Sequence, residues 1–332
     1  MCLVRDERLR LEGFKRGRRE IAGADVAEDK EWRIELAGDE LYQAFVALRP
    51  AMLALAYRIT GSRADAEDIV QECFLRFARA RPEEAVRSLK AYLGTITARL
   101  SLNRLRDQKA RRETYVGEWL PEPFATMDEP AIRAEDVSFA LLVLLERLSP
   151  VERVVFVLRT AFDLDFAQIG DVVGRDASAC RKAFSRARVR VLEEKPRFAI
   201  GRERHRALVQ GFMDATRAQD LERLVALLDE EVVLHGDGGG KAITAKKLIK
   251  GSAAVAQFVL AATRARPAGT FVVEMDLNGA PALVLRGQQA SQVAAALLFE
   301  TDGARIHSIF SVANPDKLAA LSRALRNHEM AD

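Results

Sequence analysis

The chain has 332 residues, of which 49% are apolar and 30% charged, and its formal net charge is +3. The composition is that of a soluble globular protein, and the length allows two or three domains. The longest strongly apolar run (139–145) is too short to cross a bilayer, the first twenty residues lack the apolar core of a signal peptide, and the three cysteines form no CxxC pair. We therefore expect a cytoplasmic protein without a membrane span, a disulfide framework or a metal site.

The net charge hides an uneven distribution along the chain. Residues 65–72 carry four acids and no base, whereas residues 90–112 carry seven bases and one acid. Residues 175–190 carry six bases and one acid, and beyond about residue 204 the charges nearly balance. Two basic segments followed by a neutral module indicate a nucleic-acid-binding protein with something appended.

Residues 1–38 form an N-terminal extension in which we recognise no pattern. A first helix is expected over 41–60, where Gly61 ends it, and Ser62 begins a second helix with the capping-box-like sequence SRAD. Apolar residues four apart predict the buried face of the second helix: Ile69, Cys73 and Phe77. A separate face carries acids at i, i+3 and i+7: Asp65, Asp68 and Glu72. Such a stripe is more often solvated surface, but an acidic face without a base also suits a basic partner from outside the chain.

Residues 88–112 repeat this design with the opposite charge. The predicted buried stripe is Leu89, Leu93, Ile96 and Leu100, and another face carries Arg99, Asn103 and Arg106. Solvated helix charges are the alternative interpretation. The one-sided excess of bases, together with an asparagine that can hydrogen-bond a base edge, favours DNA binding.

The next segment, TYVGEWLPEPFATMDEP, has three prolines and no helical period, which indicates an extended linker. Its Trp119 and Leu120 would be costly to leave in water, so we expect the linker to pack onto another part of the protein.

An all-helical block follows over residues 136–197. Ser149 is expected to cap a helix that begins with Pro150, and Gly174 to close a short helix over 165–173. The last helix is basic, with Ala179, Ala183 (or Phe184), Ala187 and Val191 facing inward. A helix, a tight turn with glycine and a basic helix form the helix-turn-helix pattern, whose second helix enters the major groove.

These segments resemble a known family. DAEDIVQECFLRF, AYLGTITARLSLNRLR and LERLSPVERVVFVLRTAFDLDFAQIGDVVG are similar to regions 2 and 4 of the extracytoplasmic-function (ECF) sigma factors of the sigma-70 family. The resemblance implies core RNA polymerase as the partner, with contacts to its β′ and β subunits. The β′ clamp helices would bind the acidic helix at Asp65, Glu67, Asp68, Gln71 and Glu72. The resemblance also implies that the basic helix over 88–112 melts and reads the −10 element, through Arg99, Asn103, Arg104, Arg106, Arg111 and Arg112. It assigns the −35 element to Ser178, Arg181, Lys182, Ser185 and Arg186.

A narrower resemblance concerns three short motifs. YVGEWLPEP in the linker, DGGGK at 237–241 and NPDKL at 314–318 are similar to the sigma factors that carry a fused SnoaL-like domain. Two positions depart from that pattern: Glu118 stands where proline is expected, and Asn103 stands where an acid is more usual.

The pattern of residues 204–330 supports such a domain independently. Two helices, a strand and a further helix precede four strands, with Asn278–Gly279 and Asp302–Gly303 as turns. We therefore predict a multidomain fold: a region 2 helical bundle (39–114), a linker (115–135), a region 4 helix-turn-helix (136–197) and an α+β SnoaL-like cone with a curved antiparallel sheet (204–330).

The glycine run at 238–240 has several interpretations. It is not a phosphate-binding Walker A loop, because the required spacing is missing and Ala242 follows the lysine. A plain hairpin turn is one interpretation, and an enzyme site with His235, Asp237 or His307 as acid or base is another, although such residues are more often structural. We favour an interdomain contact in which Trp119, Leu120 and Pro121 meet the loop Asp237, Gly238, Gly239, Gly240 and Lys241. Burial of Trp119 is expected to supply most of the free energy of this contact. The ion pairs, with Glu118 and Glu122 as the linker partners, are expected to be exposed and weak.

The predicted function is that of an alternative sigma factor, without catalysis or cofactor, whose C-terminal domain regulates it in cis. Two alternatives remain at this point. The chain would be a stand-alone DNA-binding regulator that needs no polymerase, or its C-terminal domain would be a small-ligand sensor or enzyme.

Overall fold

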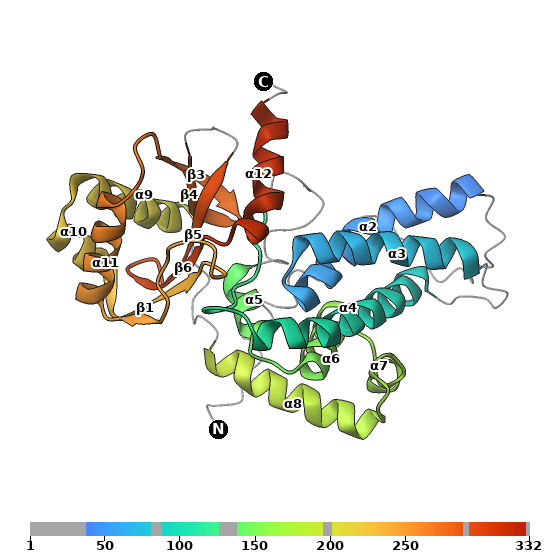
Figure 1. Cartoon of the computed structure of the whole chain (residues 1–332). Helices are drawn as coiled ribbons and strands as arrows, with labels where there is room; N and C mark the ends of the chain where they lie inside the picture. Colours follow the sequence, from blue (N-terminus) through green and yellow to red (C-terminus); the bar gives the residue numbers. More distant parts are fainter. Residues whose placement is uncertain (1–37, 81–87, 126–137, 195–200, 288–291, 330–332) are drawn as a thin grey trace.

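The computed structural model describes residues 38–80, 88–125, 138–194, 201–287 and 292–329. Residues 1–37 and the second half of the predicted linker lie outside these ranges. The described chain forms an all-helical part followed by an α+β domain, as predicted (Figure 1). None of the described helices combines the length and apolar character that crossing a membrane requires.

The first helical domain consists of α2 (Gly38–Thr60), α3 (Arg63–Ala80) and α4 (Leu89–Glu113). Gly61 adopts a left-handed φ of 68° and ends α2, and Ser62 Oγ accepts the backbone N–H of Asp65 at 3.1 Å, so both predicted boundaries are confirmed. The predicted buried residues of α3 are confirmed at 4% exposure or less: Ile69, Cys73 and Phe77.

The predicted stripe of α4 is only partly right. Leu93 is fully buried, but Leu89, Ile96 and Leu100 are half-buried. The most buried positions also include Thr97, Ala98, Ser101 and Leu102. The reason is that α4 packs against α2 and α3 and also against α6 and α7, so its buried surface is wider than one amphipathic stripe.

The second helical domain consists of α5 (Phe139–Glu146), α6 (Pro150–Ala161), α7 (Phe166–Val173) and α8 (Ala177–Glu194). Ser149 and Glu152 form a complete capping box at the start of α6, and Gly174 ends α7 with a φ of 72°. In α8 the fully buried residues are Cys180, Ala183, Ala187 and Val191. Ala179 is only half-buried, so the inward stripe begins one residue later than predicted.

The two helical domains share one hydrophobic core. Leu55 and Ile59 of α2 and Ala98, Leu102 and Leu105 of α4 pack with the buried residues of α5 to α8. Arg153 of α6 is 2% exposed, and it donates to the Ile59 carbonyl at 2.8 Å and to both carboxylate oxygens of Glu146 at 2.9 and 3.0 Å. The bidentate pair lies within the second domain and orients the guanidinium, whose bond to the Ile59 carbonyl joins the two domains.

The C-terminal domain begins with α9 (Arg202–Ala218) and α10 (Leu221–Leu227) and contains α11 (Ser252–Arg264) and α12 (Pro315–Glu329). Its strands are β1 (Leu228–Asp237), β2 (Ile249–Lys250), β3 (Phe271–Leu277), β4 (Ala280–Arg286), β5 (Val293–Thr301) and β6 (Ile306–Val312). The sheet order is β2-β1-β6-β5-β4-β3, and its pairs are antiparallel except for β1 with β6. The predicted strands and the Asn278–Gly279 turn are confirmed; α12 and the short β2 were not predicted.

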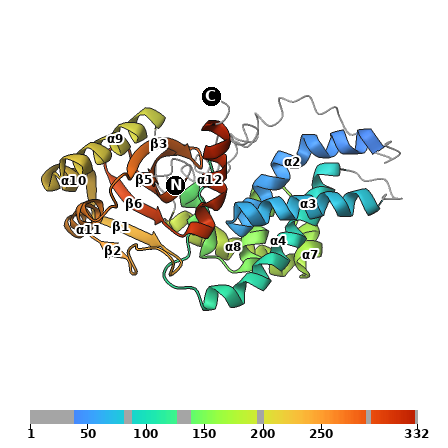
Figure 2. The same cartoon turned by 45° about the horizontal axis from the view of Figure 1, so that its top comes forward.

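Both faces of this sheet are covered. One face packs against α9, α10 and α11, through residues such as Leu283, Phe299 and Ile309. The alternating residues of the same strands, including Leu298, Phe310 and Val312, pack against the linker, α5 and α12. Figures 1 and 2 both show α12 between the sheet and the helical part, so the second face joins the two parts of the molecule.

Candidate polymerase, DNA and interdomain sites

The predicted polymerase-binding residues lie along α3 and remain accessible. Asp68 and Gln71 are exposed, and Asp65, Glu67 and Glu72 are half-buried. The expectation that this face has no internal base is wrong. Arg104 of α4 lies 3.4 Å from both Asp65 and Asp68, and the face also holds the pairs Arg63–Glu67 (2.7 Å) and Arg76–Glu72 (2.8 Å).

These pairs leave the acidic face usable. Each includes at least one partly exposed side chain, and exposed ion pairs contribute only about 0–1 kcal/mol. A basic partner can therefore displace them at low cost. Arg104 itself faces α3, so it lies on a different face of α4 from the predicted DNA-binding residues Arg99 and Arg106.

The predicted −10 residues divide into three groups. Arg99, Asn103 and Arg106 are exposed and share one face of α4, as the sequence predicts. Arg104 belongs to the acidic face described above. Arg111 and Arg112 lie in the last turns of α4, and their side chains are outside the described part of the structure.

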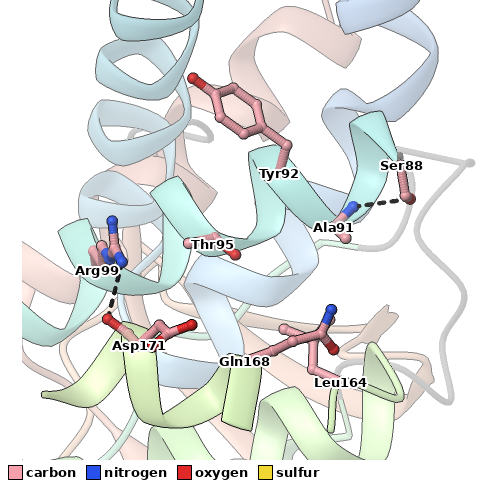
Figure 3. Close-up of a pocket in the computed structure, with 8 residues that line it drawn as sticks. All are labelled: Ser88, Ala91, Tyr92, Thr95, Arg99, Leu164, Gln168 and Asp171. Atoms are coloured by element: carbon pink, nitrogen blue, oxygen red, sulfur yellow. Dashed lines mark hydrogen bonds between the residues drawn. The ribbon is translucent and has the colours of Figure 1, made fainter. Parts of the chain in front are cut away.

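A pocket of about 310 Å³ lies between α4 and α7 and involves one of these residues. The Arg99 guanidinium crosses it and donates to the backbone carbonyl of Asp171 at 2.9 Å (Figure 3). Other lining residues come from the two helices and from the residues that precede them: Ser88, Ala91, Tyr92, Thr95, Leu164 and Gln168. The predicted −10 face therefore touches the helix that precedes the predicted −35 helix.

The predicted −35 residues are all exposed on α8: Ser178, Arg181, Lys182, Ser185 and Arg186. One of them has a partner within the chain, since Arg186 Nε donates to Glu152 at 2.9 Å, and Arg190 also contacts this carboxylate at 3.2 Å. Burial raises the pKa of Glu152, but hydrogen bonds from Arg186 and Ser149 outweigh it and leave that pKa below its ordinary value. Glu152 therefore stays ionised and binds Arg186 and Arg190 of α8.

The linker binds the C-terminal domain mainly through Asp237, the last residue of β1. This carboxylate has no exposed surface and accepts hydrogen bonds from the Tyr115 hydroxyl, the Leu120 backbone N–H at 2.9 Å and Lys317 Nζ at 2.7 Å. The ion pair is therefore buried, which corrects the expectation that the contacts here are weak and exposed. Leu120 is 1% exposed, whereas Trp119 is only half-buried.

Lys317 of α12 completes this contact. Its ammonium lies 3.6 Å from the centre of the Trp119 ring and also donates to the Leu120 carbonyl. Burial lowers the pKa of Lys317, and the neighbouring Asp237 carboxylate opposes that change. We call the set Tyr115, Trp119, Leu120, Asp237 and Lys317 the linker clasp.

The two candidate acid–base histidines, His235 and His307, have partners within the protein. His235 Nδ1 lies 2.9 Å from a Glu118 carboxylate oxygen, and its ring stacks on Phe310 with a centroid distance of 5.0 Å. His307 lies 3.0 Å from Asp302. The unusual Glu118 of the linker thus binds the same strand as the clasp.

The glycine loop meets the linker at two of its predicted positions. A β-carbon on Gly239 would collide with the Asn314 amide and lie 3.1 Å from the Tyr115 hydroxyl, and one on Gly240 would lie 3.2 Å from Val116. Both glycines have positive φ, at 59° and 72°. Gly238 instead faces Ala242 within its own loop, and Lys241 pairs with Asp316 at 2.5 Å, so the partners of these two residues lie in the C-terminal domain.

A second linker contact was not predicted. The backbone N–H and carbonyl of Phe124 bond to Asn278 at 2.9 and 2.8 Å, and the same asparagine donates to Tyr57 of α2 at 2.8 Å. Glu122 does not pair with the glycine loop as expected, because it accepts the Arg63 backbone N–H at 2.7 Å and caps α3. Pro121 is buried beside Gly61. The Asn-Gly turn was visible in the sequence, but its side-chain role was not.

Comparisons with known proteins agree with this arrangement. The family Sigma-70 region 2 matches residues 44–111, and the family Sigma-70 region 4 matches residues 138–191. The ECF RNA polymerase sigma factor SigJ of Mycobacterium tuberculosis is 37% identical over 289 residues, which cover 82% of this chain and 91% of SigJ. The probable ECF RNA polymerase sigma factor SigI of the same species is 35% identical over 200 residues, covering 58% of this chain and 69% of SigI.

A solved structure is similar over most of the chain. The crystal structure of the M. tuberculosis extracytoplasmic function sigma factor SigJ matches with a TM-score of 0.67 and 34% identity. The match covers 84% of this chain and 98% of that chain, so it includes the helical domains and the C-terminal domain.

Proposed function

Because this chain belongs to the ECF RNA polymerase sigma factors, we propose that its C-terminal SnoaL-like domain regulates promoter engagement in cis through the linker clasp. As an alternative sigma factor, the protein directs core RNA polymerase to specific promoters. The proposal concerns how the separate parts do so, with domains at 39–114, 136–197 and 204–330 joined by the linker 115–135.

In this proposal α3 binds core polymerase, the exposed face of α4 reads the −10 element and α8 reads the −35 element. The linker follows α4 directly and leads to the domain that contains α8. Docking of the linker on the C-terminal domain therefore fixes the separation between the two DNA-reading helices. The observation that carries the proposal is the buried carboxylate of Asp237, two of whose three hydrogen-bond donors, Tyr115 and Leu120, come from the linker.

We further propose that the C-terminal domain has no chemistry of its own. The residues that could act as acid or base on β1, His235 and Asp237, are both engaged by the linker. A catalytic role would require them to face a substrate instead.

The first test is run-off transcription with core polymerase and the full-length protein. Replacing Trp119 with alanine, or Gly239 with valine, is expected to change transcript yield several-fold at the cognate promoter. The alanine removes the ring beneath Lys317, and the valine adds a side chain where Asn314 and Tyr115 leave no room. Promoter sequence preference should stay as in the parent, because neither residue lies on α4 or α8.

The matched control is Lys241→Ala, which changes the same loop without touching the linker. Parental transcription by both clasp variants would contradict cis regulation through this contact. If replacing His235 or His307 removed a measurable turnover while the clasp variants transcribed normally, the C-terminal domain would be an enzyme instead.

A second test addresses the −35 assignment. Replacing Arg181 or Lys182 with alanine is expected to weaken holoenzyme binding to the cognate promoter by about 1–3 kcal/mol if the side chain contacts a base edge. Both residues are exposed on α8 and make no ion pair among the described residues, so the fold should be unaffected.

The measurement is equilibrium binding to the intact promoter and to one with a mutated −35 element. A base contact predicts that the variants lose affinity for the intact promoter and little for the mutated one. An equal loss on both would show that these residues touch only phosphates.

A further inference from the structure

A strongly basic loop of the C-terminal domain is not used by the clasp. From Gly238 to Val273 the chain has six basic residues and no acidic one. Four of them are lysines within residues 241–250: Lys241, Lys246, Lys247 and Lys250. We call residues 242–250, which follow β1 and include the short strand β2, the lysine loop; Lys241 precedes it. The near balance of charge over the whole domain conceals this concentration.

Three of these lysines are available to a partner. Lys241 pairs with Asp316, whereas Lys246, Lys247 and Lys250 are exposed and make no ion pair within the part of the chain that the structure describes. Three lysine charges within five residues, none of them in an ion pair among the described residues, attract a polyanion.

The same loop carries apolar side chains on its surface. Ile243 is fully exposed, Leu248 is about half exposed at 48%, and Ala245 between them is buried and anchors the loop to the domain. Apolar side chains interspersed with unpaired lysines indicate a surface that a partner covers. The base of the loop is thus fixed while its tip faces solvent.

The loop lies beside the end of α4. A β-carbon on Gly240 would be 3.2 Å from Val116, and Val116 follows the last residue of α4 by only three positions. Figure 2 shows the chain that leaves α4 running alongside the loop after β1. Lys246 is six residues beyond Gly240, so its backbone can be at most about 22 Å from that contact.

The position of the lysine loop next to the end of α4 indicates DNA as its partner. Duplex DNA carries one phosphate charge per about 1.7 Å of its axis, so the promoter duplex that adjoins the segment read by α4 has many phosphates within reach of the loop. We propose that the lysine loop binds the phosphate backbone of promoter DNA next to the segment read by α4. The C-terminal domain would then contribute directly to DNA affinity. The inference rests on the proposed function in one respect, since it takes α4 to lie on promoter DNA.

The test uses holoenzyme assembled from core polymerase and full-length protein carrying Lys246→Ala, Lys247→Ala and Lys250→Ala together. Each phosphate contact contributes about −0.9 to the slope of log affinity against log salt, so we expect the slope to become shallower by about 2–3. Phosphate contacts carry no sequence information, so the loss should be the same on intact and mutated promoters.

A matched variant removes three positive charges elsewhere on the same domain: Arg204→Ala, Arg217→Ala and Arg305→Ala. These positions are exposed on α9 and on the β5–β6 turn, and the slope should stay parental. An unchanged slope in the triple lysine variant overturns the proposal, as does a slope change of the same size in the arginine control. Loss of polymerase capture without a slope change would also overturn it, by placing the loop on protein.

Promoters with and without an intact −10 element separate failure of the α4 assignment from failure of the lysine loop inference. If the parental holoenzyme does not distinguish an intact promoter from one with a mutated −10 element, the assignment of α4 is wrong. If it does distinguish them and the lysine variant binds like the parent, only the lysine loop inference is wrong.

Discussion

Replacing Asp237 with asparagine is expected to release the linker from the C-terminal domain. The substitution keeps the shape of the side chain but leaves the Lys317 ammonium buried without a counter-charge. Removing one partner of a buried ion pair typically costs about 3–5 kcal/mol. If undocking relieves 3 kcal/mol of this cost by exposing Lys317 to water, the population with an undocked linker rises roughly 100-fold.

The measurement is limited proteolysis of the linker at 115–125, together with the denaturation midpoint. The linker of the parent is protected because Leu120 and Phe124 are buried, and in the variant we expect cleavage to be faster by about that factor. The denaturation midpoint reports any part of the cost that appears as lower stability of the whole chain.

Two further variants test the cause. Lys241→Ala removes an exposed pair with Asp316, which contributes about 0–1 kcal/mol, and should leave the linker protected. The double variant Asp237→Asn, Lys317→Met removes both charges and should recover much of the protection, because no buried charge is left alone. A linker as protected in Asp237→Asn as in the parent would show that the clasp is not held by this pair.

Replacing Asp68 and Glu72 with lysine is expected to abolish capture of core RNA polymerase. The two changes turn two negative charges into two positive ones on the proposed docking face, and like charges across an interface cost several kcal/mol. The internal pairs that they break are exposed, so α3 should remain folded.

Co-purification with core polymerase measures the effect, and far-UV circular dichroism checks the helix content. The control Glu203→Lys, Glu222→Lys makes the same change of charge on exposed positions of α9 and α10, away from α3. Normal co-purification of the α3 variant would remove the acidic face from the polymerase interface. Equal loss in the control would show that only net charge matters.

The sequence by itself determined the elements whose signals are local. Gly61 with Ser62, Ser149 with Pro150, and Gly174 mark helix ends through the backbone angles and caps of the residues at the boundary itself. The four-residue spacing in α3 and the alternating strands of the C-terminal domain follow from the period of each element. These features, together with the motif resemblance, were sufficient to predict the domain order, the sigma factor family and the residues exposed on α8.

Only the tertiary structure decided which polar and charged side chains contact one another. Asp237 pairs with Lys317 across 80 residues, and Tyr57 bonds to Asn278 across 221. Arg104 was expected on the DNA face, yet it contacts the acidic helix because α4 packs against α3 on that side. Glu122 was expected at the glycine loop, yet the fold brings it to the N-terminus of α3. Caps and periodicity depend on neighbours in sequence. The partner of a buried charge depends instead on which elements pack together, and the local sequence pattern does not specify that packing.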